Sequence, residues 1–106
     1  MKLVSAIIQP YMFDKLSRVL RKQKLTRFTM CAVKSYGVPD GESSIDLMSD
    51  KVRIDLFVHD DQAIEVSELI AKTVGTHQEG DGLIFVSDLT HVINIDTGKY
   101  DSQAFS

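Results

Sequence analysis

The chain has 106 residues, of which 43% are hydrophobic and 25% charged, and its formal net charge is −3. These values are typical of a single globular domain with a modest core, and they exclude the strongly basic surface of a nucleic-acid-binding protein. No apolar run approaches the roughly 20 residues of a membrane span, and the lone Cys31 excludes an intrachain disulfide. We therefore expect a cytoplasmic protein without nucleic-acid binding or direct membrane insertion.

The first half of the chain shows strand and helix patterns in turn. Residues 3–8 are predominantly apolar, which predicts a strand covered on both faces and ended by Pro10. From residue 13 to residue 23, apolar side chains recur at helical spacing opposite a row of lysines and arginines, which predicts an amphipathic helix. Residues 28–36 are rich in Phe, Thr, Val and Tyr and predict a second strand. The polar segment that follows, residues 38–50, predicts a loop.

The second half begins with a clear alternation over residues 51–58, which predicts a strand with one apolar face: Val52, Ile54, Leu56 and Val58. Asp60 and Asp61 are candidate N-caps for a helix over 62–74, which Gly75 would end. Residues 83–86 and 91–95 predict two further strands. The order is that of a ferredoxin-like βαββαβ split fold of the α+β class, with a short extra strand, in a single domain over residues 1–106.

A glycine-rich segment lies directly ahead of the strand at 83–86. Glycine permits unusual φ values and close approach, so successive backbone N–H groups of Gly80, Asp81 and Gly82 could cradle a phosphate. The same three residues also fit a plain tight turn. The next residue is Leu83, where a phosphate site would favour a lysine.

Several separated motifs, in the right order, resemble the PII signal-transduction proteins over nearly the whole chain. The motifs are Ala6-Ile7-Ile8-Gln9-Pro10, Thr26-x-x-Thr29, Val33-Lys34-Ser35-Tyr36-Gly37, Lys51-Val52-Arg53-Ile54, Gly80-Asp81-Gly82-x-Ile84-Phe85-Val86 and Thr97-Gly98. The resemblance implies a homotrimer that binds adenine nucleotides in clefts between subunits, with a long loop that docks onto enzymes or membrane transporters. It implies a regulatory protein rather than an enzyme, with no catalytic residue and no metal site.

The resemblance also implies roles for single residues. Thr29 and Ile7 would hold the adenine, and Lys51 would reach a phosphate or a carboxylate effector. The 38–50 loop corresponds to a shortened T-loop, residues 75–83 to the phosphate-cradling B-loop and residues 96–106 to a C-terminal loop near the nucleotide. The predicted nucleotide-binding set is Ile7, Thr26, Thr29, Tyr36, Gly37, Lys51, Asp55, Phe57, Glu79, Gly80, Asp81, Gly82, Leu83 and Asn94.

Three positions depart from the family pattern in a way that changes the expected ligand. A lysine after the glycines and two arginines on the last strand are replaced by Leu83, Asn94 and Asp96. Strand alternation would turn Asn94 and Asp96 into the same cleft. Each charge-assisted hydrogen bond to phosphate is worth roughly 1.5–3 kcal/mol, so losing three removes roughly 4–9 kcal/mol of triphosphate binding. We therefore expect ADP or AMP to be favoured over ATP.

The 38–50 loop is a second departure. It is shorter than the ordinary PII loop and holds no tyrosine, so the family's uridylylation site is absent, and the glutamine usual near its start is replaced by Val38-Pro39. The lost basic residues fit divergent PII-like proteins, among them the carboxysome-associated, bicarbonate-responsive type, better than the nitrogen-sensing members, which makes bicarbonate a candidate co-effector. The alternatives are a nitrogen-regulatory or transporter-regulating PII-like protein, a small phosphohydrolase on the same scaffold, and a trimeric interaction module with a vestigial pocket.

Overall fold

The computed structural model describes residues 1–36 and 48–105. Its elements in chain order are β1 (Lys2–Ile8), η1 (Pro10–Met12), α1 (Phe13–Lys22), β2 (Phe28–Tyr36), β3 (Met48–Val58), η2 (Asp60–Gln62), α2 (Ala63–Val74), β4 (Gly82–Asp88) and η3 (Asp101–Phe105). The predicted helices and the four main strands are confirmed. Strand β3 begins at Met48, so the predicted loop end at residue 50 was wrong, and the rest of that loop lies outside the described residues.

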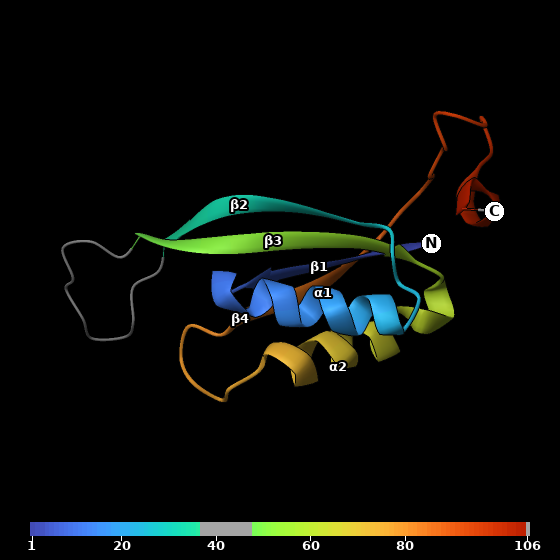
Figure 1. The fold of residues 1–106 in the computed structure, drawn as a ribbon. Coiled ribbons are helices and arrows are strands. Elements are labelled where there is room, and N and C mark those ends of the chain that lie inside the picture. Colours follow the sequence, from blue (N-terminus) through green and yellow to red (C-terminus); the bar gives the residue numbers. More distant parts are fainter. Residues whose placement is uncertain (37–47, 106) are drawn as a thin grey trace.

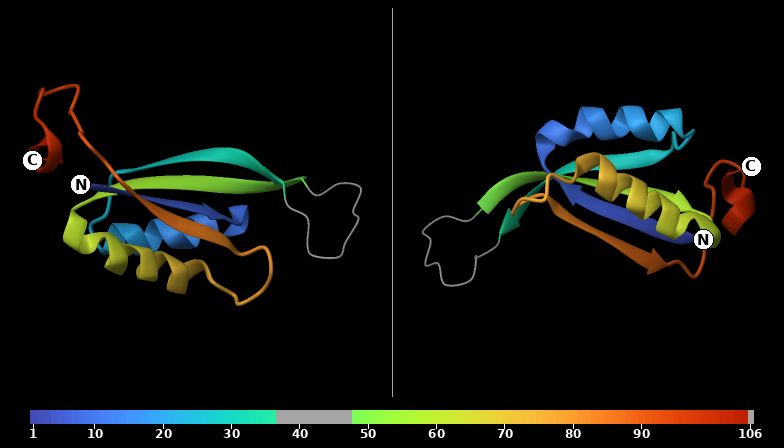
Figure 2. Two further views of the ribbon diagram at one scale, coloured as in Figure 1. Left: turned by 180° about the vertical axis from the view of Figure 1, so that it is seen from behind. Right: turned by 90° about the horizontal axis from the view of Figure 1, so that it is seen from below.

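The four strands form one antiparallel sheet in the order β2-β3-β1-β4. Strand β1 lies in the middle, where Ile8 is opposite both Val52 of β3 and Gly82 of β4. Both helices cover the same face of this sheet (Figures 1 and 2). This strand order and layering confirm the predicted ferredoxin-like α+β fold.

The hydrophobic core lies between the sheet and the two helices. The predicted alternation along β3 is confirmed, since Val52, Ile54, Leu56 and Val58 are all buried. Helix α1 contributes Leu16 and Leu20, helix α2 contributes Val66 and Ile70, and β1 contributes Val4, Ala6 and Ile8. Burial of this apolar area is the main favourable term in folding.

The opposite face of the sheet, which we call the open face, carries no α-helix among the described residues. Leu3 and Ile7 of β1 point to this side and are only half-buried, so the expectation that β1 is covered on both faces is not met within one chain. A polar network lies in the middle of the open face. The Ser5 hydroxyl, fully buried, donates to the Asp55 carboxylate at 2.6 Å, and Arg53 Nε donates to the same carboxylate at 3.2 Å.

The predicted strand over 91–95 was wrong. This segment forms only an isolated bridge, between Ile93 and Tyr100, and Ile95 is 99% exposed. A strand needs a neighbouring strand to satisfy its backbone groups, and within the described chain the sheet ends at β4. The chain after residue 95, which we call the tail, instead turns back, and its helix η3 lies beside the N-terminal end of β1 (Figure 1).

The ends of helix α2 also differ in detail from expectation. Asp60 and Asp61 lie in η2 rather than at the N-cap, which is Gln62, and the Asp60 carboxylate pairs with the N-terminal amine at 2.8 Å. Gly75 ends the helix as predicted, but its φ of −73° is not left-handed. A Cβ at Gly75 would lie 2.7 Å from the Ala71 carbonyl oxygen, so there is no room for a side chain at this position.

Candidate functional site

The segment from the end of α2 to the first residue of β4, residues 75–82, is called here the glycine loop. It lies at the end of the sheet where β2 ends and β3 begins (Figure 1). Gly80 and Gly82 have φ values of 91° and 116°, a region that side-chain-bearing residues rarely adopt. A Cβ at Gly82 would lie 1.8 Å from the Ile7 carbonyl oxygen. Gly82 is therefore required both by its backbone conformation and by the close approach of β1.

The side chain of Asp81 holds the glycine loop together from within. Its carboxylate accepts hydrogen bonds from the Thr76 hydroxyl and, at 2.7 Å, from the Thr76 amide. These two bonds, the hydroxyl's first, hold the pKa of Asp81 below its ordinary value of 3.8. The Asp81 amide donates a long bond of 3.3 Å to the Gln78 carbonyl. A phosphate cradled by three successive amides would therefore have to replace this last bond.

Two side chains converge on the carbonyl oxygen of Gly80. Lys51 Nζ donates to it at 2.9 Å, and Gln9 Nε2 donates at 2.6 Å. Lys51 is only 9% exposed, although burying an ammonium group is costly unless it is hydrogen-bonded. Lys51 thus ties β3 to the glycine loop and places a positive charge beside it.

Ile7 and Leu83 extend this end of the site along the neighbouring strands. Ile7 lies opposite Arg53 on one side and Leu83 on the other. Leu83 is 58% exposed, directly after the glycine loop. Thr29 and Asp55 are farther along the sheet, where they form a register pair of β2 and β3. Asp55 is already bonded to Ser5 and Arg53, so its carboxylate is engaged within the chain.

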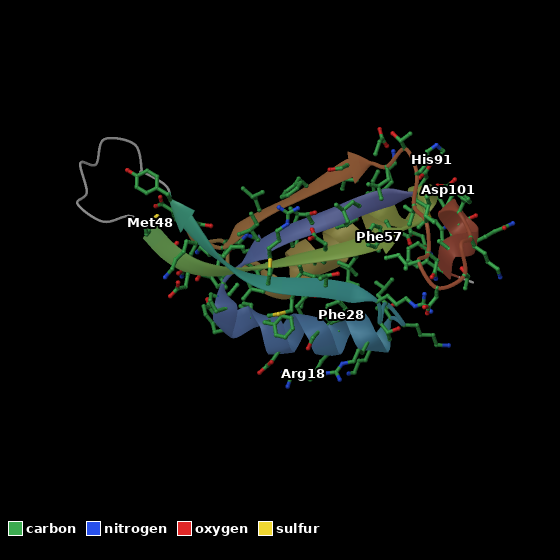
Figure 3. The ribbon with its side chains drawn as sticks, turned by 90° about the horizontal axis from the view of Figure 1, so that it is seen from above. Arg18, Phe28, Met48, Phe57, His91 and Asp101 are labelled. Atoms are coloured by element: carbon green, nitrogen blue, oxygen red, sulfur yellow. The ribbon has the colours of Figure 1, made fainter. Side chains whose placement is uncertain are left out.

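A second group of predicted residues lies at the opposite end of the sheet. Phe57 is 41% exposed, and its ring centroid is 5.7 Å from that of Phe105 in the tail. Thr26 lines a hollow of about 220 Å³ together with these two rings. Figure 3 shows Phe57 and Met48 at opposite ends of β3. Phe57 lies six positions after Lys51 along β3, which corresponds to about 20 Å.

The remaining predicted residues have varied positions. Asn94 and Asp96 do not alternate on a strand, so the alternation that was expected to turn both into one cleft is not formed. The Asn94 side chain instead accepts from the Asp96 amide at 2.8 Å and donates to the Ala104 carbonyl at 2.7 Å, which shapes the turn before the tail. Tyr36 and Glu79 are exposed, and Gly37 lies outside the described residues.

Sequence reasoning did not assign Gln9 and Thr76 to the site, although both organise the glycine loop. Gln9 belonged to a family motif, but only the fold brings it to Gly80. Nothing in the sequence pointed to Thr76, because its role depends on the Asp81 carboxylate accepting a hydrogen bond from the Thr76 amide, five residues earlier in the chain. Within residues 1–36 and 48–105, no group of three His, Cys, Asp or Glu side chains is arranged to hold a metal ion. The described helices are also too short or too polar to cross a membrane.

Comparison with known proteins matches residues 1–99 to the family model described as nitrogen regulatory protein P-II. The chain is 35% identical to nitrogen regulatory protein P-II of Porphyra purpurea and 36% identical to nitrogen regulatory protein GlnK of Escherichia coli K12. It is also 35% identical to nitrogen regulatory protein P-II 1 of the same bacterium. Each comparison covers 98% of this chain and 99% of the relative. The first two alignments span 112 positions against a chain of 106 residues, so both relatives hold residues that this chain lacks.

Proposed function

Because the chain belongs to the nitrogen regulatory protein P-II family, we propose that it is a signalling protein that binds an adenine nucleotide, ADP or AMP in preference to ATP. The nucleotide binds in clefts between the subunits of a homotrimer. It biases the 38–50 loop between states and thereby controls a partner enzyme or transporter, with bicarbonate as a co-effector. The family consists of regulatory signalling proteins, and the nucleotide preference and the link to bicarbonate are the proposed refinement.

The observation that carries the proposal is the contact of Lys51 with the glycine loop. The contact places a buried ammonium 2.9 Å from the Gly80 carbonyl, next to backbone with positive φ. An ammonium has three donors, so Lys51 can bind an anion and the loop together. The Asp81 carboxylate is bonded back to Thr76, which keeps its negative charge engaged inside the loop.

The placement of the predicted residues at two ends of the sheet supports a cleft between subunits. The glycine loop and Lys51 lie at one end of the sheet, and Thr26 and Phe57 lie at the other, about 20 Å away along β3. A single bound nucleotide cannot contact both ends of one chain. It can contact both if the Phe57 end of one subunit packs beside the glycine loop of the next, as in a closed ring of identical subunits.

The preference for fewer phosphates follows from the charges at the cleft. Leu83 is apolar and exposed where the family resemblance implies a lysine, and the Asn94 side chain is engaged in the turn before the tail. Lys51 therefore supplies the main positive charge beside the glycine loop. One cation together with main-chain amides matches the charge of a mononucleotide or diphosphate better than that of a triphosphate.

A thermal-shift screen with AMP, ADP, ATP, cyclic AMP and bicarbonate tests the proposal. A ligand that binds only the folded state must raise the melting temperature. We expect AMP and ADP to raise it at concentrations at which ATP has less effect. A shift with ATP alone would contradict the preference, and no shift with any nucleotide would favour a module with a vestigial pocket. Turnover of ATP or acyl phosphates would instead identify a phosphohydrolase.

A further inference from the structure

Positive charge is concentrated in one short stretch of the chain. Six of its 12 lysines and arginines lie between residues 15 and 27, and none of its 15 acidic residues does. The six are Lys15, Arg18, Arg21, Lys22, Lys24 and Arg27, and all are exposed. With a total of −3 and +6 in this stretch, the rest of the chain carries −9. The stretch is therefore a local basic patch on an acidic protein.

Helix α1 arranges part of this charge in a line. Lys15, Arg18 and Lys22 are spaced i, i+3 and i+7, which places them on one helical face. Leu16 and Leu20 occupy the other face and are fully buried. Figure 3 shows the Arg18 side chain pointing away from the sheet. We call this line of three cations the basic stripe. No ion pair joins it to a carboxylate in the described part of the chain.

A hollow lies where the C-terminal end of α1 meets the start of α2. Its volume is about 280 Å³, and Leu25, Val66 and Leu69 supply its apolar lining. Gln23, Gln62 and Glu65 complete its wall. Lys22 and Lys24 flank Gln23 in the chain, so the hollow borders the basic patch. A hollow of this size accepts one apolar side chain of a partner, and such an anchor typically contributes most of the energy of an interface.

We propose that the basic stripe and this hollow form a docking surface for an acidic segment of a partner protein, which inserts an apolar side chain into the hollow. This surface belongs to the helix layer, on the side of the sheet opposite the open face (Figures 1 and 2). The hollow lies at the start of α2, whereas the glycine loop follows the end of α2, so the docking surface does not depend on the proposed nucleotide site.

The charges of the neighbouring helix favour a narrow partner over a membrane or a nucleic acid. Helix α2 covers the same face of the sheet as α1, and its Glu65 and Glu68 are exposed. A flat anionic bilayer laid on the helix layer would meet these carboxylates together with the stripe. Leu16 and Leu20 of α1 are fully buried and Phe13 packs against the core, so these side chains are not available for insertion into lipid. An acidic peptide can keep its carboxylates on the stripe and present only an apolar side chain to the hollow, where Glu65 lies, so that its charges meet cations rather than the α2 carboxylates.

A labelled peptide of about a dozen residues, with glutamates along one helical face and a single leucine, tests this surface by fluorescence anisotropy. The Arg18→Glu/Lys22→Glu variant should bind it at least about tenfold more weakly than the unmodified protein. The matched control, Lys72→Glu/Lys99→Glu, makes the same charge change at two other exposed positions and should bind within about twofold of it. Circular dichroism checks that both variants are folded.

The specificity of the surface is tested with altered probes. A peptide with alanine in place of the leucine should bind about tenfold more weakly, because the hollow loses its anchor. Phosphatidylserine vesicles and single-stranded RNA should bind more weakly than the peptide at equal salt. No peptide binding at low salt, equal loss in the two variants, or tighter binding to vesicles or RNA would overturn the proposal.

Discussion

Lys51 of β3 and Gly80 of the glycine loop are joined by a hydrogen bond of 2.9 Å between the lysine ammonium and the glycine carbonyl oxygen. The two residues are 29 positions apart in the chain. Lys51 is 9% exposed, so this bond is largely shielded from water. It connects the first half of β3 to the glycine loop, so a ligand bound beside it would contact both elements.

We expect the Lys51→Met variant to lose both the hydrogen bond to the Gly80 carbonyl and the positive charge that would bind the ligand. Methionine retains the apolar stem, while a hydrogen bond to a charged group is worth about 1.5–3 kcal/mol. Urea denaturation should show a loss of that order, and calorimetric titration should show AMP and ADP affinity falling about tenfold or more. Lys51→Arg, which keeps the charge, should lose less affinity. Unchanged nucleotide affinity in Lys51→Met would show that this ammonium does not contact the ligand.

Gly82→Ala should be among the most destabilising single changes in the chain. Its Cβ would lie 1.8 Å from the Ile7 carbonyl oxygen, at a φ of 116°, so the backbone must move. We expect a loss of about 3 kcal/mol or more in the free energy of unfolding. Gly98→Ala is the control, because it shares a positive φ of 72° but meets no atom within 4 Å. It should cost about 1 kcal/mol, and equal losses would contradict the role of the Ile7 contact.

The glycine loop should loosen in acid through Asp81. Its pKa is lowered by the Thr76 hydrogen bonds, so its stabilising effect is complete above its unfolded-state pKa of about 3.8. The effect is lost as the pH falls through the lower folded-state pKa. NMR titration of the Thr76 and Gln78 amide signals should therefore show a transition below 3.8. The Asp81→Asn variant should show none, and a transition centred above the ordinary value would contradict the account.

The Leu83→Lys variant should bind ATP more tightly than the unmodified protein, because the added lysine can bind a phosphate. Leu83 is 58% exposed next to Gly82, so a longer side chain fits without disturbing the core. One added charge-assisted bond of about 1.5–3 kcal/mol should raise ATP affinity between about tenfold and 150-fold. AMP affinity should change less, because AMP carries fewer phosphates. Leu83→Gln provides a neutral control in the same calorimetric titration, and an equal gain in both variants would exclude a charge effect.

The fold was predictable where local pattern and tertiary packing agree. The alternation from Val52 to Val58 indicated its buried face correctly because β3 is covered by helices on one side only. Residues 91–95 have the same apolar character, yet Ile95 is almost fully exposed because no strand of the described chain pairs with them. Strand propensity shows a preference for a pleated surface, whereas a strand also needs an available partner.

The sequence predicted which residues belong to the site better than it predicted the hydrogen bonds that those residues make. The glycine pattern indicated Gly80 and Gly82 correctly as positions of unusual backbone, because few other residues adopt positive φ. The inward turn of the Asp81 carboxylate could not be predicted, since it depends on the Thr76 amide and hydroxyl. The Asn94 contact with Ala104 likewise depends on how the tail folds back.

Calorimetric titration of the purified protein with AMP, ADP and ATP, beside Lys51→Met, tests the central claim most directly. The claim is that main-chain amides of the glycine loop and a single buried ammonium bind a nucleotide of low phosphate charge. We predict saturable binding of AMP and ADP at least as tight as that of ATP, and weakened in the variant. Submicromolar ATP binding together with undetectable AMP binding would contradict it.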